Sequence, residues 1–343
     1  MKIDLLVGAR PNLVKAAALL HAAKDFPQIQ FTLVHTGQHH GAMSDPYFKD
    51  LRLLEPVFPC DELTGCTALI RFGQMIKGLG RRYKHERPDA IVVVGDTDST
   101  LAGAIAGAKA GIPVLHVEAG LRNGDTKMQE EINRILVDSI ATKHYATNWF
   151  SCNNLMLEGK KGIRVGNVMQ DTLFRFLPEA REKFSRKKPY AVFTMHRAEN
   201  IDNVGRCLEL TVAIQKISES IPIVWPVHPR LPSVPGKSGD LHLVPPMSYL
   251  EFIATLEGAK FVITDSGGVQ EEASILGVPC MTLRDNTERP ETIIYGTNVL
   301  VKPEDVVKQA DKFLNGVPQW HSSEMYMAGS AAHRILEDIC ATL

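Results

Sequence analysis

Residues 89–118 read DAIVVVGDTDSTLAGAIAGAKAGIPVLHVE, and this stretch indicates how the chain folds. The apolar run at Asp89–Val94 predicts a buried strand that ends at Gly95-Asp96. The alanine-rich segment Ser99–Ala110 predicts a helix, and Val114–Val117 predicts the next strand. Buried strands joined by helices are typical of parallel sheets that are covered on both faces. The stretch therefore predicts an α/β fold.

The same alternation of apolar runs and helical patterns extends in both directions along the chain. We expect two doubly wound, Rossmann-like α/β domains that face each other across a cleft, in a GT-B-like arrangement. The predicted domains are residues 1–166 and 167–325, and the last helix, at about 326–343, is expected to pack back on the first domain. The boundary falls between Gly166 and Pro189, because this stretch holds the charged run Arg181–Lys188 and is the least strand-like part of the chain.

Length and charge limit the possible functions. The chain has 343 residues, which suggests about two domains. Its 38 Lys and Arg against 39 Asp and Glu give a net charge of −1, which argues against a nucleic-acid-binding protein. The apolar runs are far shorter than the ~20 residues that cross a bilayer. Met1–Asp4 leads directly into a strand-like run, so we expect no signal peptide, no membrane segment and a cytoplasmic location.

The six cysteines show no metal-binding or disulfide pattern. They stand at positions 60, 66, 152, 207, 280 and 340, and none forms a CxxC pair. Scattered thiols of this kind are typical of reduced, structural cysteines. Neither HExxH nor a Cys/His ligand spacing occurs, so we expect no metal site.

Acidic side chains follow neighbouring strands of the predicted first domain. Ligands of doubly wound sheets bind beyond the carboxyl ends of the strands. Asp96 and Glu118 close two strands that one helix separates, and Glu130 lies at the start of the following helix. Crowded carboxylates have raised pKa values, which suits acid–base catalysis. The alternative for Glu130 is an ion pair with Arg134 on the helix surface.

Two histidines follow strands of the predicted second domain. His196 ends one strand in the segment TMHRAEN, and His228 ends another in PVHPR. A single histidine in such a place is more often structural. Two at matching strand ends favour a functional site.

Ser266-Gly267-Gly268 stands between a predicted strand and a predicted helix. Glycines allow a close approach of backbone to an anion, and a helix N-terminus offers free N–H groups. The segment predicts a diphosphate site, with a tight turn capped by Ser266 as the alternative. Glu272, one turn further along, is a candidate ligand of ribose hydroxyls or else a solvated glutamate. Arg289 is a candidate anion contact in a polar loop or else part of a capped surface turn.

Arg10 and Lys15 occupy the corresponding turn of the first domain. The segment Gly8–Pro11 is not GxGxxG, so the dinucleotide fingerprint is missing. The guanidinium of Arg10 suits a phosphate, and Lys15 adds a second charge one turn later. The alternative is a pair of surface cations.

Eight motifs in fixed order resemble the non-hydrolysing UDP-N-acetylglucosamine 2-epimerases and their relatives that act on UDP-2,3-diacetamido-2,3-dideoxyglucuronate. The motifs are Gly8–Pro11, His35–His39, Gly95–Thr97, His116–Arg122, Glu130–Arg134, His196–Asn200, Asp265–Glu272 and Thr287–Glu291.

This resemblance implies a GT-B-like fold and reversible epimerisation at C2 of a UDP-sugar without a cofactor. UDP is eliminated to leave an unsaturated glycal and then returns. The resemblance also implies a homodimer that supplies precursors of cell-surface polysaccharides. A GT-B glycosyltransferase and a binding protein without catalysis are the alternatives.

Carried over to this chain, the resemblance assigns two groups of residues. The acid–base group is Asp96, Glu118, Glu130 and His196. The group that binds UDP and substrate is Arg10, Lys15, Gln38, His228, Ser266, Gly267, Gly268, Glu272 and Arg289.

Overall fold

The computed structural model describes residues 1–38, 45–60, 67–184, 189–227, 231, 239–316, 327 and 329–343. The chain divides into two compact units, one formed by Met1–Thr172 with Tyr326–Leu343 and the other by Leu173–Met325. Within the described ranges, no helix has the length and apolar character that a membrane crossing requires.

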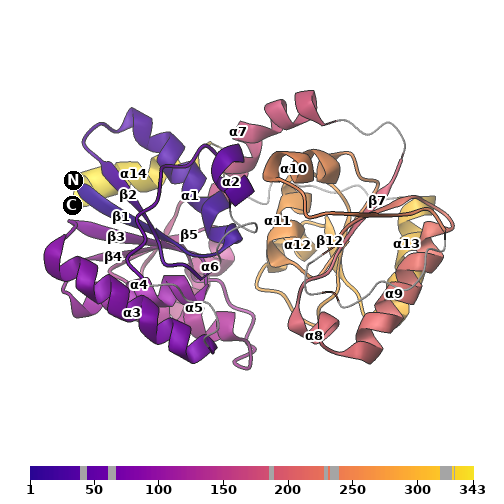
Figure 1. Cartoon of the computed structure of the whole chain (residues 1–343), viewed down its shortest axis with the longest axis horizontal. Coiled ribbons are helices and arrows are strands. Elements are labelled where there is room, and N and C mark those ends of the chain that lie inside the picture. The colour runs from indigo at the N-terminus through magenta and orange to yellow at the C-terminus, as the bar shows by residue number, and fades with distance from the viewer. Residues whose placement is uncertain are drawn as a thin grey trace. The chain divides into compact units, whose positions relative to one another are not determined.

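A six-stranded parallel sheet forms the centre of the first unit, in the order β2-β1-β3-β4-β5-β6 (Figure 1). The strands are β1 (Lys2–Val7), β2 (Gln30–His35), β3 (Ala90–Val94), β4 (Val114–Ala119), β5 (Lys143–Ala146) and β6 (Gly162–Arg164). Because all strands run the same way, their carboxyl ends lie at one edge of the sheet.

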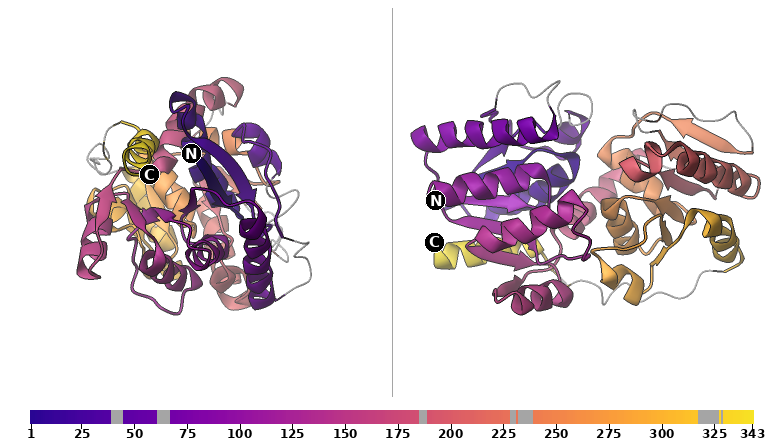
Figure 2. Two further views of the ribbon diagram at one scale, coloured as in Figure 1. Left: turned by 90° about the vertical axis from the view of Figure 1, so that its left-hand side faces the viewer. Right: turned by 90° about the horizontal axis from the view of Figure 1, so that it is seen from below.

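Helices cover both faces of this sheet. They are α1 (Arg10–Ala22) with the short η1 (Ala23–Asp25), α2 (Asp45–Asp50), α3 (Ala68–His85), α4 (Asp98–Lys109), α5 (Gln129–Ile140), α6 (Trp149–Leu157) and α14 (Ala331–Thr342). Figure 2 shows α3, α4 and α5 side by side over one face, and α14 packs against α1.

The stretch 89–118 folds as its sequence predicts. All residues of β3 are buried, and Thr97 caps α4 by accepting a hydrogen bond from the amide of Thr100. Gly103 allows α4 to approach the sheet, since a Cβ there would lie 2.2 Å from a methyl carbon of Leu6. The predicted strand at Val114–Val117 is longer than expected, because β4 continues through Glu118 to Ala119.

The second unit contains another six-stranded parallel sheet, in the order β12-β11-β10-β7-β8-β9. Its strands are β7 (Ala191–Thr194), β8 (Ile223–Pro226), β9 (Leu241–Val244), β10 (Val262–Thr264), β11 (Cys280–Thr282) and β12 (Asn298–Leu300). Its helices are α8 (Ala198–Ile201), α9 (Val204–Ser218), α10 (Tyr249–Glu257), α11 (Gly267–Ile275), α12 (Pro290–Ile294), η3 (Pro303–Asp305) and α13 (Val306–Asn315).

Apolar side chains fill both faces of the second sheet. Trp225 and Phe193 stack edge to face, with ring centroids 4.6 Å apart, in the core that α9 and α13 help to form. Tyr190 and Val262 belong to the core on the other side. Two sheets of parallel strands with helices on both faces confirm the predicted α/β class.

One helix passes from the first unit into the second. This helix, α7 (Val168–Lys183), lies in the stretch where the sequence predicts the domain boundary. At its start, the carboxylate of Asp171 accepts hydrogen bonds from Ser330 and from the amides of Ala331 and Ala332. Asp171 therefore fixes the first turn of α14 within the first unit.

Candidate functional site

Glu118 lies at the carboxyl edge of the first sheet in an unusual backbone conformation. Its φ angle is +70°, and the pairing of β4 with β5 shifts between Val117 and Ala119. A non-glycine residue in this left-handed region costs roughly 1–3 kcal/mol and persists only where the surroundings hold it. The carboxylate of Glu118 forms an ion pair with the ammonium group of Lys15 on α1, and both residues are buried.

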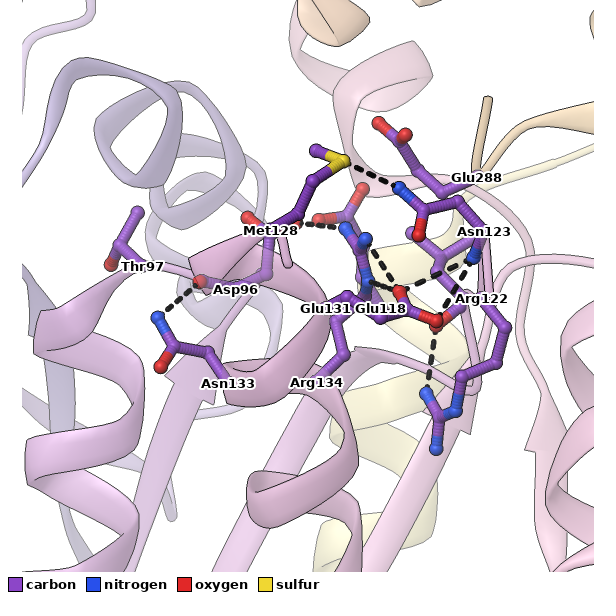
Figure 3. A network of polar contacts seen from close by, with 12 residues as sticks. Asp96, Thr97, Glu118, Arg122, Asn123, Met128, Glu131, Asn133, Arg134 and Glu288 are labelled. Carbon is purple, nitrogen blue, oxygen red and sulfur yellow. Dashed lines mark hydrogen bonds and ion pairs between the residues drawn. The ribbon is translucent and has the colours of Figure 1, made fainter. Parts of the chain in front are cut away.

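Asp96 belongs to a second set of ion pairs at the same edge (Figure 3). The guanidinium of Arg134 donates to Asp96 at 2.5 Å and to Glu131 at 2.7 and 2.8 Å. Glu131 also accepts hydrogen bonds from the backbone amides of Asn123 and Gly124. Asn133 donates to the carbonyl oxygen of Asp96 at 2.9 Å. Two carboxylates thus share one buried guanidinium.

The alternative for Glu130 was an ion pair with Arg134 on the helix surface. In the structure, Arg134 pairs instead with Glu131 and Asp96. Glu130 is half-buried in the first turn of α5, while Glu131 and Arg134 are buried. Glu131, Arg134 and Asp138 are not among the site residues that the sequence predicts. Their spacing of three and four residues, which places them on one helix face, is the signal that could have found them.

Asp138 is a buried carboxylate close to Glu118. It accepts a hydrogen bond from Nδ1 of His116 at 2.6 Å, and its other oxygen lies 2.8 Å from the guanidinium of Arg122. Burial alone would raise the pKa of Asp138, but the interactions with His116 and Arg122 outweigh it and lower the pKa to about 2. The carboxylate is therefore ionised at neutral pH.

Arg10 and Gln38 lie after the first two strands of this sheet. The guanidinium of Arg10, at the start of α1, lies 5.8 Å from the centre of the Tyr47 ring. The side-chain oxygen of Gln38 accepts hydrogen bonds from the amide and the hydroxyl of Ser99, at 3.1 and 2.7 Å. Gln38 thus holds the chain after β2 against the first turn of α4.

Asp265 organises the carboxyl edge of the second sheet. Its buried carboxylate accepts from the amides of His196 and Arg197, from the side chain of Asn200 at 3.0 Å, and from Nδ1 of His196 at 2.8 Å. Burial tends to raise the pKa of Asp265, but these donors, His196 first, lower it to about 2. The His196 side chain is 43% exposed, so an oriented imidazole faces solvent within this unit.

Ser266, Gly267 and Gly268 form the turn into α11. Ser266 caps the helix by accepting a hydrogen bond from the amide of Val269 at 3.4 Å, as the structural alternative expects. A Cβ at Gly267 would lie 2.6 Å from a carboxylate oxygen of Glu288, whose position Arg284 holds through an ion pair of 2.8 Å. A side chain at Gly267, the first residue of α11, would therefore collide with Glu288.

Glu272 and Arg289 are buried in the same unit. Burial, together with the neighbouring carboxylate of Glu271, raises the pKa of Glu272 to about 8 despite a hydrogen bond with Tyr249. Arg289 forms an ion pair of 2.8 Å with the buried Glu271. The guanidinium of Arg289 thus has the carboxylate of Glu271 as a partner within the unit. His228, the remaining predicted ligand, lies outside the described residues.

Within the described residues, no group of three or more His, Cys, Asp and Glu side chains is arranged to hold a metal ion. The charged groups gather instead at the carboxyl edge of each parallel sheet. Two units in one chain, each with a parallel sheet and polar groups after its strands, are typical of the two-domain α/β enzymes with a GT-B-like fold.

Comparison with known proteins identifies the family. The model of the UDP-N-acetylglucosamine 2-epimerase family matches residues 21–340, so the chain belongs to this family. A UDP-N-acetylglucosamine 2-epimerase of Methanococcus maripaludis is 35% identical, with 94% of each chain covered. The UDP-2,3-diacetamido-2,3-dideoxy-D-glucuronate 2-epimerase of Pseudomonas aeruginosa is 36% identical, with 98% of this chain and 99% of the other covered.

Solved structures agree with this family. The UDP-GlcNAc 2-epimerase of Methanocaldococcus jannaschii, solved in complex with UDP-GlcNAc and UDP, has a TM-score of 0.91 and 35% identity, with 99% of this chain and 100% of that chain covered. The glycosyltransferase SnogD of Streptomyces nogalater has a TM-score of 0.60 at 14% identity and covers 99% of this chain and 98% of that chain. At this low identity, the similarity to the glycosyltransferase shows a shared fold alone.

Proposed function

We propose that this protein interconverts UDP-N-acetylglucosamine and UDP-N-acetylmannosamine by reversible epimerisation at C2. The observation that carries this proposal is the similarity over nearly the whole chain to an epimerase that was solved with UDP-GlcNAc and UDP. The buried pair Lys15–Glu118 and the pair Arg134–Asp96 support it, since they place carboxylates at the sheet edge where ligands bind.

The chemistry explains why several ionisable groups are needed. The acetamido group activates the C2 proton only weakly, so a base removes it while the C1–O bond to UDP breaks. The C–H electron pair forms the C1=C2 double bond, and UDP leaves with the electrons of the C–O bond. A proton then adds to the opposite face of C2, and UDP returns to C1. Each of these steps moves a proton or UDP and none transfers a hydride, so the reaction needs no redox cofactor, and we propose that none takes part.

We propose Asp96, Glu118, Glu130 and His196 as the acid–base and charge-handling groups. Cationic and backbone donors would stabilise the negative charge on the departing UDP, which matters most where water is scarce. For this role we propose Arg10, Lys15, Ser266, Gly267, Gly268 and Arg289. We propose Gln38 and His228 as further residues that bind UDP or substrate. Glu272 would contact the ribose.

A test by proton NMR in deuterated water follows directly. The purified protein and UDP-N-acetylglucosamine should give the manno epimer with deuterium at C2, without any added cofactor. Turnover without C2 label would contradict the elimination. Free N-acetylmannosamine as the product would instead indicate a hydrolysing enzyme.

A second substrate has specific support. The relative from Pseudomonas aeruginosa that is named for UDP-2,3-diacetamido-2,3-dideoxy-D-glucuronate is as similar as the UDP-N-acetylglucosamine 2-epimerases. The same label experiment with each sugar, at matched concentration, distinguishes the two candidates by kcat/KM. A glycosyltransferase would release UDP only with an acceptor and would form a glycoside.

We further propose that the enzyme is a cytoplasmic homodimer that supplies a precursor of cell-surface polysaccharide. This proposal rests on the family resemblance of the whole chain. Light scattering coupled to size-exclusion chromatography measures the mass in solution, and a monomer at working concentration would contradict the dimer.

A further inference from the structure

The carboxylate of Asp138 joins the two flanks of the strained turn at Glu118. One oxygen accepts from Nδ1 of His116 at 2.6 Å, and the other accepts from the amide of Gly120 at 3.0 Å. His116 lies two residues before Glu118, and Gly120 lies two residues after it. A single side chain on α5 thus binds the imidazole of His116 before the turn and the backbone amide of Gly120 after it.

The turn itself needs such support. Glu118 and Gly120 both have positive φ angles, +70° and +82°, and the register with β5 shifts at this point. A side chain at Gly120 would collide with the backbone of α6, because its Cβ would lie 2.3 Å from the carbonyl oxygen of Ser151. The chain here is confined by contacts that are distant in sequence, as expected where a strained residue has a function.

His116 connects the same carboxylate to the residue before Asp96. Its Nε2 donates to the carbonyl oxygen of Gly95 at 2.9 Å, and the amide of Gly95 donates to the carbonyl of Val117 at 3.0 Å. Both backbone polar groups of Gly95 are therefore bonded to β4. Asp138, through His116, reaches both of the strand ends that carry Glu118 and Asp96.

We infer that Asp138 is a positioning residue for the epimerisation, which holds the carboxylate of Glu118 in its reactive place through His116 and the amide of Gly120. The inference rests on the proposed function. Reacting groups must be held within a fraction of an ångström, and a misplacement of about 1 Å costs about 10²-fold in rate. Asp138 itself does not reach solvent, since its side chain is fully buried, and it acts on Glu118 through its bonds to His116 and Gly120.

The test is Asp138→Asn in the full-length protein. The amide has the shape of the carboxylate, but its NH2 group cannot accept the hydrogen bond from Gly120 or from His116. We expect kcat to fall about 10²-fold while KM for UDP-N-acetylglucosamine stays within about threefold, because a positioning residue acts on the reacting groups and not on UDP.

Asp338→Asn is the matched control. Asp338 accepts hydrogen bonds from Lys143 at 2.6 Å and Tyr145 at 2.8 Å in the same unit, but it belongs to α14, and these partners lie on β5 and not in the turn at Glu118. This variant should lower the unfolding midpoint and leave kcat within about twofold. An equal loss of kcat in both variants would overturn the inference, since it would show a general effect of destabilisation.

His116→Gln provides a second variant if Asp138→Asn does not fold. It removes the Nδ1 donor but leaves Asp138 bonded to Gly120 and Arg122, and we expect a loss of about 10-fold in kcat at unchanged KM. If a folded variant at either position keeps the wild-type kcat, the inference about Asp138 is overturned while the proposed function stands. A wild-type protein that introduces no deuterium at C2 would overturn the proposed function and, with it, this inference.

Discussion

The ammonium group of Lys15 and the carboxylate of Glu118 form an ion pair that is almost completely shielded from solvent. Lys15 comes from the first helix and Glu118 from the end of β4, so only the folded sheet brings them together. Gly95 permits this approach, since a Cβ there would lie 2.7 Å from the Lys15 nitrogen. The proposed base and its cationic partner thus form one buried unit.

Removing the cation should destabilise the protein more than removing the pair. For Lys15→Met we expect a loss of about 3–5 kcal/mol in the free energy of unfolding, because Glu118 then lacks its cation in a buried position. The double variant Lys15→Met, Glu118→Gln should recover a large part of this loss. Urea unfolding of both variants measures the difference, and equal stabilities would argue against a strong pair.

Neutralising the proposed acid–base groups should abolish most of the turnover. For Glu118→Gln and Asp96→Asn we expect kcat to fall roughly 10²–10⁴-fold, the usual range for acid–base groups. Rates of deuterium entry at C2 report the proton transfer directly. Wild-type rates in both variants would refute the assignments.

Glu130 and Glu131 should respond differently to the same change. Glu131→Gln weakens the buried pair with Arg134, so we expect a lower unfolding midpoint, with a loss of about 1–3 kcal/mol. Glu130 is half-buried and has no part in that pair, so Glu130→Gln should lower kcat with little loss of stability. Thermal unfolding and kinetics of the two variants separate the roles. If only Glu131→Gln loses activity, the catalytic assignment of Glu130 is wrong.

The buried Glu272 should make stability depend on pH. Its pKa is raised from 4.5 to about 8, so the folded state prefers the protonated form. This contribution is fully present below pH 4.5 and is lost as the pH rises toward 8, at up to about 1.4 kcal/mol per pH unit.

Glu272→Gln mimics the protonated side chain and provides the measurement. The variant and the wild type should have similar stability near pH 4.5, and the variant should be the more stable protein at pH 8.5. Denaturant titrations across this range test the prediction. Parallel curves for the two proteins would contradict the raised pKa.

A methyl group at Gly267 should disturb the turn into α11. The added carbon would lie 2.6 Å from a carboxylate oxygen of Glu288, which can move away only by straining its ion pair with Arg284, so for Gly267→Ala we expect a loss of about 1 kcal/mol, at the low end of overpacking. Gly205→Ala is the matched control, because its Cβ would meet only Asn203 at 3.5 Å in the first turn of α9. Calorimetric unfolding should show a lower midpoint for the first variant alone.

The fold was largely readable from the sequence, because apolar runs and helical periods are local signals. The stretch 89–118 predicts β3, α4 and β4 to within about two residues. Polar residues after the strands could also be selected, since parallel strands bring their carboxyl ends to one edge. Asp96, Glu118 and His196 all lie at such ends in the structure.

The partners of these residues could not be predicted in the same way. Glu131, Arg134 and Asp138 were missed because a charged residue in a helix is usually solvated, and it is the packing of α5 against α4 and β4 that buries them. The same holds for Asp265, which the sequence presents as the residue before a glycine turn but which collects hydrogen bonds from four donors around His196 and Asn200.

The amino-acid sequence by itself determined the α/β class, the order of strands and helices along the chain, and the family, because these follow from local periodicity and from motifs in fixed order. The tertiary structure alone decided which charges face each other: Lys15 with Glu118, Arg134 with Asp96 and Glu131, and Asp138 with His116. Apart from Arg134 and Glu131, which are neighbours on one helix, these pairs join different elements of the chain. Their energies depend on burial and on distances of a few ångströms, which only the folded chain sets.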